Sequence, residues 1–263
     1  MHSFEPMAFA PIDELPALSL PQLQDAASFL TRRDRKYIVP ADTVASLLDG
    51  LEAGTRVLEI DGRRTFRYST RYFDDRHAAY FRALRKRPDR FKVRTRRYEE
   101  SGECQLEVKL LDVRGRTVKS RFPHESGEME TLSTLDRAWL RSFEPVRAVA
   151  SQLEPSVATW YHRSTLVFPD GSGRMTIDQG LTFVGEDGLW QRLESHCVIE
   201  TKGPGHPLPF DRLLWSAGFR PAPASKFALG VCLTNPDLPH NRWRRLRARL
   251  APALSGPMVA SPR

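Results

Sequence analysis

The sequence reads FKVRTR at residues 91–96, a strict alternation of basic side chains with apolar or hydroxyl-bearing ones. In a β-strand, successive side chains point to opposite faces of the sheet. As a strand, this stretch would therefore gather Lys92, Arg94 and Arg96 on one face and leave the apolar side chains on the other.

Other segments repeat this alternation. LEVKL at residues 106–110 places Glu107 and Lys109 on one face, and TVKSR at residues 117–121 places Lys119 and Arg121 there. Later segments add charged residues in the same kind of position, namely Arg163, Arg174, Asp178, Glu200 and Lys202. A single strand of this kind would also suit a sheet with one solvated face. Across all the segments, however, the charged positions are mostly Arg and Lys with few neutral polar residues, which favours a charged interior with helices over the apolar face.

The eight segments with period-two alternation are predicted strands, and glycines at residues 102, 115, 171 and 173 indicate antiparallel hairpins between neighbours. The predicted strands cover residues 34–39, 65–73, 91–98, 104–111, 117–122, 158–168, 174–184 and 196–202. Helical periodicity predicts helices over residues 21–30, 41–51, 132–143, 210–217 and 241–250. We therefore expect an α+β fold, an eight-stranded antiparallel β-barrel with helices packed outside.

Composition limits the classes of function. The 263 residues are 40% hydrophobic and carry a net charge of +8, which suits a folded domain with a polyanionic partner. The three cysteines form no CxxC motif, so we expect neither a disulfide framework nor a zinc site. No GxxxxGK[ST] motif is present, and no apolar stretch approaches the length of a membrane-spanning helix. With no signal-peptide pattern at the N-terminus, we expect a cytoplasmic protein.

Crowded cations need a compensating charge. Two like charges 4 Å apart repel each other by roughly 4 kcal/mol at an effective dielectric constant of about 20. A triphosphate supplies negative charge, and the guanidinium group matches phosphate oxygens in a bidentate way. The few carboxylates among the cations are then candidate ligands of Mg²⁺ or Mn²⁺, which prefer oxygen donors and share them with phosphates.

Several of these segments resemble the polyphosphate polymerase domain of the vacuolar transporter chaperone (VTC) family, within the triphosphate tunnel (CYTH-like) metalloenzymes. The resemblance covers residues 31–233 in family order. It rests on nine motifs, which are DRKY at 34–37, STRYFD at 69–74, FKVRTR at 91–96, LEVK at 106–109, VKSR at 118–121, YHR at 161–163, RMTID at 174–178, IETK at 199–202 and SKF at 225–227.

The resemblance implies site residues. As catalytic residues it implies Lys36, Arg94, Arg96, Lys109 and Glu200. As phosphate-binding residues it implies Lys92, Lys119, Arg121, Arg163, Arg174, Lys202 and Lys226. It also implies Glu200 as the ligand of Mn²⁺ or Mg²⁺, with Glu107 and Asp178 as further candidates for the metal or for orienting the cations.

Three functions stay open at this point. The resemblance favours a polymerase that transfers the γ-phosphoryl group of ATP to a growing polyphosphate chain and releases ADP. A triphosphatase of the same fold is the first alternative, and a polyanion-binding module without turnover is the second. Few carboxylates among many cations favour the polymerase, because a phosphate acceptor needs no general base whereas a hydrolase benefits from carboxylates that activate water.

The expected organisation is an N-terminal arm over residues 1–30, the catalytic domain over residues 31–235, and a basic C-terminal helix with a tail over residues 236–263. The expected partners are ATP and polyphosphate. A separate membrane protein or an anionic membrane surface could bind the basic helix. No specific nucleic acid is expected, since stacking aromatic residues are not interleaved with the basic strand faces.

Overall fold

The computed structural model describes residues 5–26, 33–111, 117–171, 173–223 and 225–257, and the chain forms two compact units. Unit 1 comprises Met1–Phe66, Tyr161–Leu181 and Leu193–Pro223. Unit 2 comprises Arg67–Trp160, Thr182–Arg192 and Ala224–Arg263. Each unit is therefore assembled from segments that are distant in the sequence.

The sheet of unit 1 contains β2 (Arg33–Pro40), β11 (His196–Gly203) and most of β9 (Arg174–Val184). Strand β11 lies between the other two and pairs antiparallel with both. Strand β1 (Ala17–Leu18) pairs in parallel with β3 (Arg56–Leu58), which pairs antiparallel with β8 (Glu154–Val167). The helices of this unit are α1 (Ala10–Asp13), α2 (Leu20–Ala26), α3 (Ala41–Leu48) and α7 (Pro209–Ser216).

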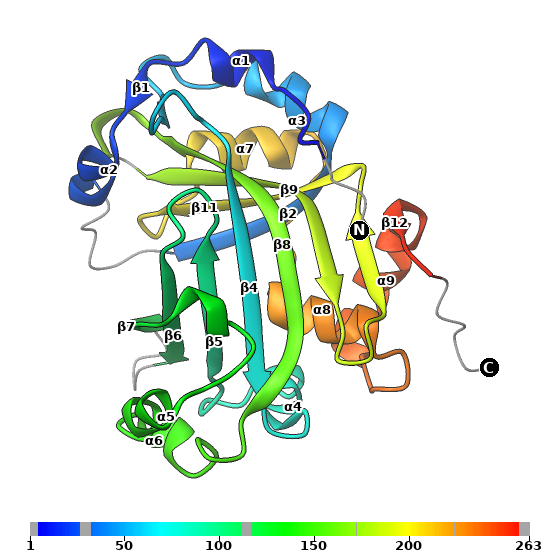
Figure 1. Cartoon of the computed structure of the whole chain (residues 1–263). Helices are drawn as coiled ribbons and strands as arrows, with labels where there is room; N and C mark the ends of the chain where they lie inside the picture. Colours follow the sequence, from blue (N-terminus) through cyan, green and yellow to red (C-terminus); the bar gives the residue numbers. More distant parts are fainter. Residues whose placement is uncertain (1–4, 27–32, 112–116, 172, 224, 258–263) are drawn as a thin grey trace. The chain divides into compact units, whose positions relative to one another are not determined.

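The core of unit 1 lies on one face of this sheet. Helices α1, α3 and α7 all lie on that side (Figure 1). Tyr37, Ile177 and Ile199 of the sheet pack in the same buried cluster as Val44 of α3 and Leu214 of α7. Each such aliphatic side chain contributes about 1.5–3 kcal/mol by leaving water. The alternation of the strands leaves Lys36, Glu200 and Lys202 on the opposite face.

A buried polar network joins α7 to the sheet. The Asp211 carboxylate, which is fully buried, accepts hydrogen bonds from the Tyr37 hydroxyl at 2.8 Å and the Thr201 hydroxyl at 2.6 Å. Arg35 Nη1 lies 3.2 Å from the same carboxylate, and the backbone N–H of Leu208 donates to it at 2.8 Å. Every one of these donors offsets part of the cost of burying the charge.

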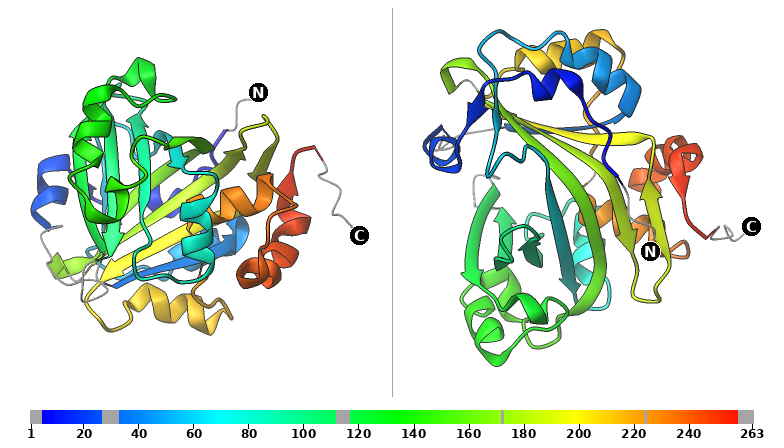
Figure 2. Two further views of the ribbon diagram at one scale, coloured as in Figure 1. Left: turned by 90° about the horizontal axis from the view of Figure 1, so that it is seen from below. Right: turned by 45° about the horizontal axis from the view of Figure 1, so that its top comes forward.

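In unit 2, β4 (Phe66–Asp74), β5 (Lys92–Tyr98), β6 (Cys104–Leu111) and β7 (Thr117–Pro123) are antiparallel neighbours in this order. The short strands β10 (Trp190–Leu193) and β12 (Leu254–Ser255) also belong to this unit. Its helices are α4 (Ala78–Leu84), α5 (Thr134–Leu140), α6 (Glu144–Arg147), α8 (Lys226–Thr234) and α9 (Arg244–Leu250). Helices α5 and α6 lie side by side near the ends of β6 and β7 (Figures 1 and 2).

Helix α8 depends on a glycine. A Cβ atom at Gly230 would lie 2.7 Å from the Phe183 ring and 2.8 Å from a methyl group of Val157. The absence of a side chain at this position therefore lets α8 approach the strands closely.

The predicted α+β, antiparallel class is confirmed, but the closed eight-stranded barrel is wrong. Twelve strands pair, in the order β12-β10-β9-β8-β4-β5-β6-β7, with β11 and β2 attached through β9 and β3 and β1 attached through β8. Within the described part of the chain, β7 pairs with β6 alone, so the sheet is open. Alternation along a strand identifies its two faces, but closure depends on which strands pair at the two edges, and alternation carries no information on that pairing.

The eight predicted strands all exist, with bounds within a few residues of the prediction. Among the helices, those predicted over 41–51 and 210–217 appear as α3 and α7, and part of the one predicted over 21–30 lies outside the described residues. The helix predicted over 241–250 begins with a 3₁₀ turn at Asn241–Trp243. In the described ranges, no helix is long and apolar enough to cross a membrane.

Candidate functional site

The charged face of unit 1 centres on Glu200. Lys36 is its direct partner across the β2–β11 pair, and Lys36 Nζ lies 3.2 Å from Glu200 Oε1. Lys202, two residues further along β11, places its Nζ 3.3 Å from the same oxygen. Two ammonium groups thus flank one carboxylate, and all three side chains lie on the sheet face opposite the helix-covered core.

Three further predicted residues, Arg163, Asp178 and Arg174, lie on this face, and the first two form an ion pair. Arg163 of β8 binds Asp178 of β9 in a bidentate way, with Nε 2.5 Å from Oδ1 and Nη2 2.8 Å from Oδ2. Arg174 is the register partner of Lys202 across the β9–β11 pair. Unit 1 therefore collects Lys36, Lys202, Arg163 and Arg174 around two carboxylates.

The two lysines of this face differ in pKa. For Lys36, burial disfavours the charged form, but Glu200 and Asp34 outweigh it, so the pKa of Lys36 lies above its ordinary value. For Lys202, burial prevails and the nearby arginines add to it, which lowers the pKa to about 8. Lys36 is accordingly a permanent cation, whereas Lys202 titrates close to neutral pH.

The charged face of unit 2 centres on Glu107 of β6, which is fully buried. Its register partners are Arg94 on β5 and Arg121 on β7. Arg94 Nε lies 2.7 Å from Glu107 Oε2, Arg121 Nε lies 3.3 Å from Oε1, and the Lys119 ammonium group also contacts Oε1. One carboxylate on β6 therefore holds three cations from the two neighbouring strands, Arg94 of β5 and Lys119 and Arg121 of β7.

These contacts determine the pKa values of Glu107 and Lys119. Burial alone would raise the pKa of Glu107, but Arg94, Arg96 and Lys119 outweigh it and hold the pKa far below the usual range of a carboxyl group. Burial, together with the neighbouring Arg94 and Arg121, lowers the pKa of Lys119 to about 7 despite the attraction of Glu107. The carboxylate is therefore charged at every physiological pH, and the lysine titrates near neutrality.

Two hydroxyl groups of the neighbouring strand β4 form hydrogen bonds with Arg94 and Arg96. Neither of these hydroxyl-bearing residues was predicted as a site residue. The Tyr72 hydroxyl accepts a hydrogen bond from Arg94 Nη1 at 3.2 Å, and the Thr70 hydroxyl accepts one from Arg96 Nε at 3.3 Å. Both residues lie on β4, in register with β5. The alternation of hydroxyl groups at residues 70 and 72 is the sequence signal that could have identified them.

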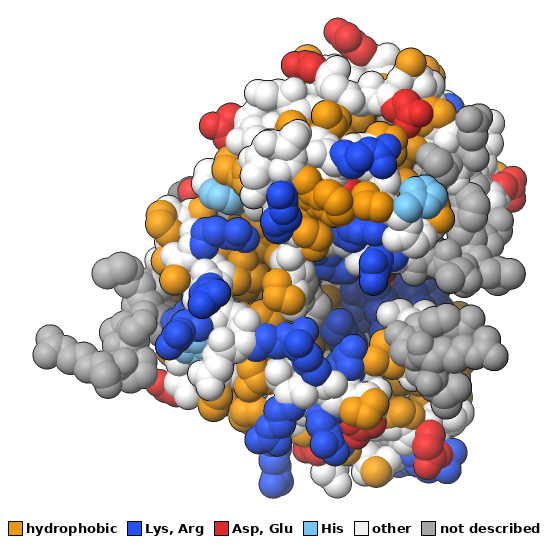
Figure 3. All heavy atoms as spheres, turned by 180° about the vertical axis from the view of Figure 1, so that it is seen from behind, with side chains coloured by type: hydrophobic (Ala, Val, Ile, Leu, Met, Phe, Trp, Pro, Cys, Tyr) orange, Lys and Arg blue, Asp and Glu red, His pale blue; other side chains and the backbone are white. Residues whose placement is uncertain are grey.

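The remaining predicted residues also fall in unit 2. Lys92 and Lys109 are register partners across the β5–β6 pair, and Lys109 is in turn the partner of Lys119 across β6–β7. Lys226 is the first residue of α8, directly after the Ser225 cap. The structure thus divides the predicted site residues into six in unit 1 and eight in unit 2. The face seen from behind shows many Lys and Arg side chains (Figure 3).

The carboxylates constrain how a divalent cation could bind. Both oxygens of Asp178 are engaged by Arg163, and Glu107 is held by three cations. Among the described residues, no three His, Cys, Asp or Glu side chains gather as a metal-binding group. The donor set therefore does not fit an ion held by the protein alone. It fits Mg²⁺ or Mn²⁺ that is shared between one carboxylate, Glu200, and the oxygens of a phosphate ligand.

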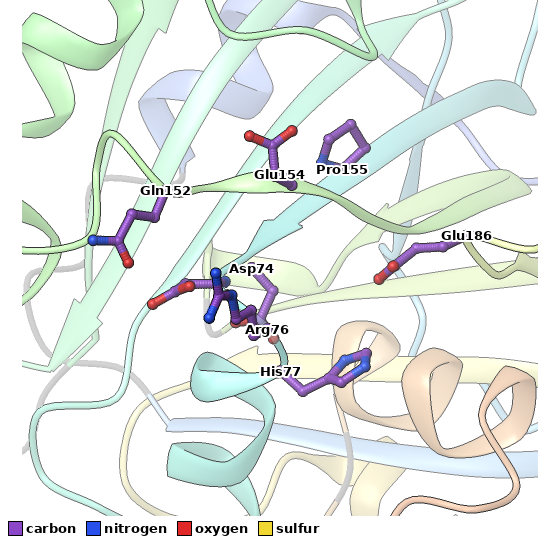
Figure 4. Close-up of a pocket in the computed structure, with 8 residues that line it drawn as sticks. Asp74, Arg76, His77, Gln152, Glu154, Pro155 and Glu186 are labelled. Carbon is purple, nitrogen blue, oxygen red and sulfur yellow. The ribbon is translucent and has the colours of Figure 1, made fainter.

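Unit 2 also contains a cavity of about 420 Å³ that none of the predicted site residues lines. Figure 4 shows Asp74 at the end of β4 and Arg76 and His77 in the segment that follows it, with Glu154 and Glu186 also at the cavity wall. The buried Asp74 carboxylate accepts hydrogen bonds from the backbone N–H groups of Ala79 at 2.7 Å and Tyr80 at 3.1 Å, so it holds the start of α4. The predominance of carboxylates makes this cavity unsuited to phosphate.

The two charged faces suit a highly charged anion. Each provides several Lys and Arg side chains whose positions are fixed by strand register and by a central carboxylate. Fixed cations stabilise phosphoryl groups without reorganisation during a reaction. Among the described residues, the contacts of Glu200 and Glu107 given above are all with Lys and Arg.

Comparisons with known proteins give a family match and structural similarities. The VTC domain model matches residues 31–235. No curated protein matches the chain. A putative adenylyl cyclase from Hippeastrum, described as having a dominant triphosphatase activity, is 15% identical with a TM-score of 0.49 and covers 80% of this chain and 100% of its own. The PH1012 protein from Pyrococcus horikoshii OT3 is 11% identical with a TM-score of 0.43 and covers 78% of this chain and 100% of its own.

Proposed function

Because the chain belongs to the VTC domain family, we propose that it is a metal-dependent polyphosphate polymerase, which transfers the γ-phosphoryl group of ATP to a polyphosphate chain and releases ADP. The observation that carries the proposal is the pair of ammonium groups, Lys36 and Lys202, on a single carboxylate, Glu200. This group offers charge for phosphate and one oxygen ligand for a metal that arrives with the nucleotide.

The reaction itself needs little from the protein beyond position and charge. A terminal oxygen of the acceptor phosphate attacks the γ-phosphorus in line and forms a new P–O bond. The bond between the γ-phosphorus and the β,γ-bridging oxygen breaks, and its electron pair leaves with ADP. The acceptor oxygen is already anionic at neutral pH, so no proton has to be removed from it.

In this proposal, the cations of both charged faces bind phosphate groups. Lys36 and Lys202 neutralise phosphate oxygens beside Glu200, while Arg94, Arg96 and Lys109 of unit 2 do so on the face organised by Glu107. Lys92, Lys119, Arg121, Arg163, Arg174 and Lys226 are assigned as further phosphate ligands. Mg²⁺ or Mn²⁺ bound at Glu200 would supply Lewis-acid stabilisation of phosphoryl charge.

The scarcity of carboxylates supports a transferase over a hydrolase. Water must lose a proton to attack phosphorus, and a general base or a second metal ion assists that step. On the unit 1 face, Arg163 engages both oxygens of Asp178, whereas the two lysines at Glu200 both contact its Oε1.

Product analysis tests the proposal. Purified protein incubated with Mn²⁺ and ATP labelled on its γ-phosphate should place the label in chains that exopolyphosphatase degrades. If all of the label appears as orthophosphate, the protein is a triphosphatase. If no label is transferred although polyphosphate binds, it is a binding module.

A further inference from the structure

Two basic segments of unit 2, separated by some 150 residues of sequence, lie side by side. Arg242 Nη1 donates a hydrogen bond of 2.6 Å to the backbone carbonyl of Ala83 at the end of α4. The rings of Tyr80 and Trp243 lie 5.5 Å apart between their centroids. These contacts join the segment that contains α4 and its following loop to the segment that contains α9.

The surface that they form is strongly cationic. Residues 82–90 and 241–250 contain one acidic residue, Asp89, and ten basic ones, namely Arg82, Arg85, Lys86, Arg87, Arg90, Arg242, Arg244, Arg245, Arg247 and Arg249. We call these ten residues the α4–α9 basic surface. None of them is among the predicted site residues described above.

Most of this charge is available to a ligand. Arg85, Lys86, Arg87, Arg244, Arg245 and Arg249 are exposed. Asp89 is close to only two of the ten, at 3.3 Å from Arg82 and 3.9 Å from Arg87. Lys and Arg side chains are also frequent in the lower half of the face seen from behind (Figure 3).

The cations of the two segments are close enough to repel one another. Partial burial, and next the charge of Arg90, lower the pKa of Arg242. Such a concentration of like charge favours a ligand that carries many negative charges along its length.

The exposed side chains indicate which polyanion fits. The large apolar side chains that are exposed in the described residues lie elsewhere, at Met7, Leu20, Val118 and Leu135, so this surface offers no apolar group for insertion into a bilayer. Trp243 is buried and Phe81 is half-buried beneath Arg85, so neither is presented for stacking on nucleic-acid bases. The surface thus suits a polyanion that has neither bases nor acyl chains.

We infer that the α4–α9 basic surface is a second binding site for long-chain inorganic polyphosphate, one that a short tripolyphosphate does not require. The identity of the polyanion rests on the proposed function, whereas the site itself rests on the charges and contacts above. A polyphosphate bound here would stay on the protein after it had become too long for the residues of the two charged faces to contact all of it.

The test compares the binding of two inorganic polyphosphates that differ only in chain length. The triple variant Arg85→Gln/Arg244→Gln/Arg245→Gln removes three exposed charges, and Arg63→Gln/Arg141→Gln/Arg212→Gln removes three exposed charges elsewhere as a matched control. Affinities for tripolyphosphate and for polyphosphate of about one hundred units would be measured by fluorescence anisotropy at two salt concentrations. The triple variant should bind the long chain about tenfold more weakly, with a shallower salt dependence, and should bind tripolyphosphate like the wild type. The control should bind both ligands like the wild type.

Three results would overturn the inference. The first is unchanged long-chain affinity in the triple variant, and the second is an equal loss in the matched control. The third is a triple variant that loses binding to phosphatidylserine vesicles or single-stranded RNA while keeping its affinity for polyphosphate, which would assign the surface to those ligands. The synthesis of polyphosphate by the wild type is measured in a separate assay. A protein that synthesises chains but fails the binding test contradicts only this inference, and one that passes the binding test but makes no chains contradicts only the proposed function.

Discussion

Lys36 and Glu200 face each other across the antiparallel β2–β11 pair, with Nζ 3.2 Å from Oε1. Their chain neighbours, Tyr37 and Thr201, point to the other face of the sheet and both donate hydrogen bonds to the buried Asp211 carboxylate. A strand that slipped by one residue would break these bonds and would turn Lys36 and Glu200 to opposite faces. The buried network therefore fixes the register that brings the two charged residues together.

Removal of Asp211 should destabilise the protein strongly. Asp211→Ala leaves the Tyr37 and Thr201 hydroxyl groups and the Arg35 guanidinium group without their buried acceptor. We expect a loss of about 3–5 kcal/mol in the free energy of unfolding, measured by urea denaturation. Asp42→Ala, at an exposed position in the first turn of α3, should cost less than about 1 kcal/mol. Equal effects of the two substitutions would contradict the role of the network.

Glu107→Gln should destabilise the free protein and leave its ligand complex less affected. The substitution removes the charge that compensates Arg94, Lys119 and Arg121, at a cost of about 3 kcal/mol. A bound polyanion can take over that compensation. Tripolyphosphate should therefore raise the melting temperature of Glu107→Gln more than that of the wild type or of the exposed control Glu103→Gln. Equal shifts in all three proteins would show that Glu107 does not organise a phosphate-binding face.

Phosphate affinity should fall as the pH rises from about 6 to 9. The pKa of Lys119 is lowered to about 7 and that of Lys202 to about 8, so each is cationic below these values and loses its charge above them. Anion binding needs the charged form, so the loss occurs on the alkaline side. Isothermal titration with tripolyphosphate should show this decline for the wild type.

The control for this pH dependence replaces both lysines by arginine. Arginine stays charged far above pH 9. The variant Lys119→Arg/Lys202→Arg should therefore lack the decline in affinity that the wild type shows from pH 7 to 9. A decline as steep as that of the wild type would assign the pH dependence to other groups.

The sequence predicted the strands well because charge and apolar residues alternate along them without interruption. In FKVRTR at residues 91–96, every second residue is basic, and the register of β5 with β6 places Arg94 opposite Glu107 as the alternation requires. The local pattern was sufficient because both the strand and its two faces follow from it.

Helix α8 was not predicted, for a physical reason. All residues from Phe227 to Thr234 are buried, so the segment lacks the polar stripe by which an amphipathic helix is recognised. The short strands β1, β3, β10 and β12 have two to four residues each, too few for an alternation to be detected. These strands extend the pairing beyond the eight predicted strands.

The site was predicted in its residue types and only partly in its contacts. Glu107 was a candidate for the metal or for orienting the cations, and it forms ion pairs with Arg94, Lys119 and Arg121. Asp178 likewise binds Arg163 with both oxygens. Such pairing depends on side-chain reach between strands, which the alternation of residues does not encode. The assignment of Glu200 to a metal stays a prediction.

The most direct test of the proposed function is the synthesis of polyphosphate from ATP and Mn²⁺, with ADP and chain phosphate quantified together. The wild type should form one ADP for each phosphate added to a chain. Glu200→Gln should lower the rate by about a hundredfold or more, as the loss of a group that stabilises the transition state does. The exposed control Glu194→Gln should retain the wild-type rate. Release of orthophosphate without chains by the wild type, or chain synthesis by Glu200→Gln at the wild-type rate, would contradict the account.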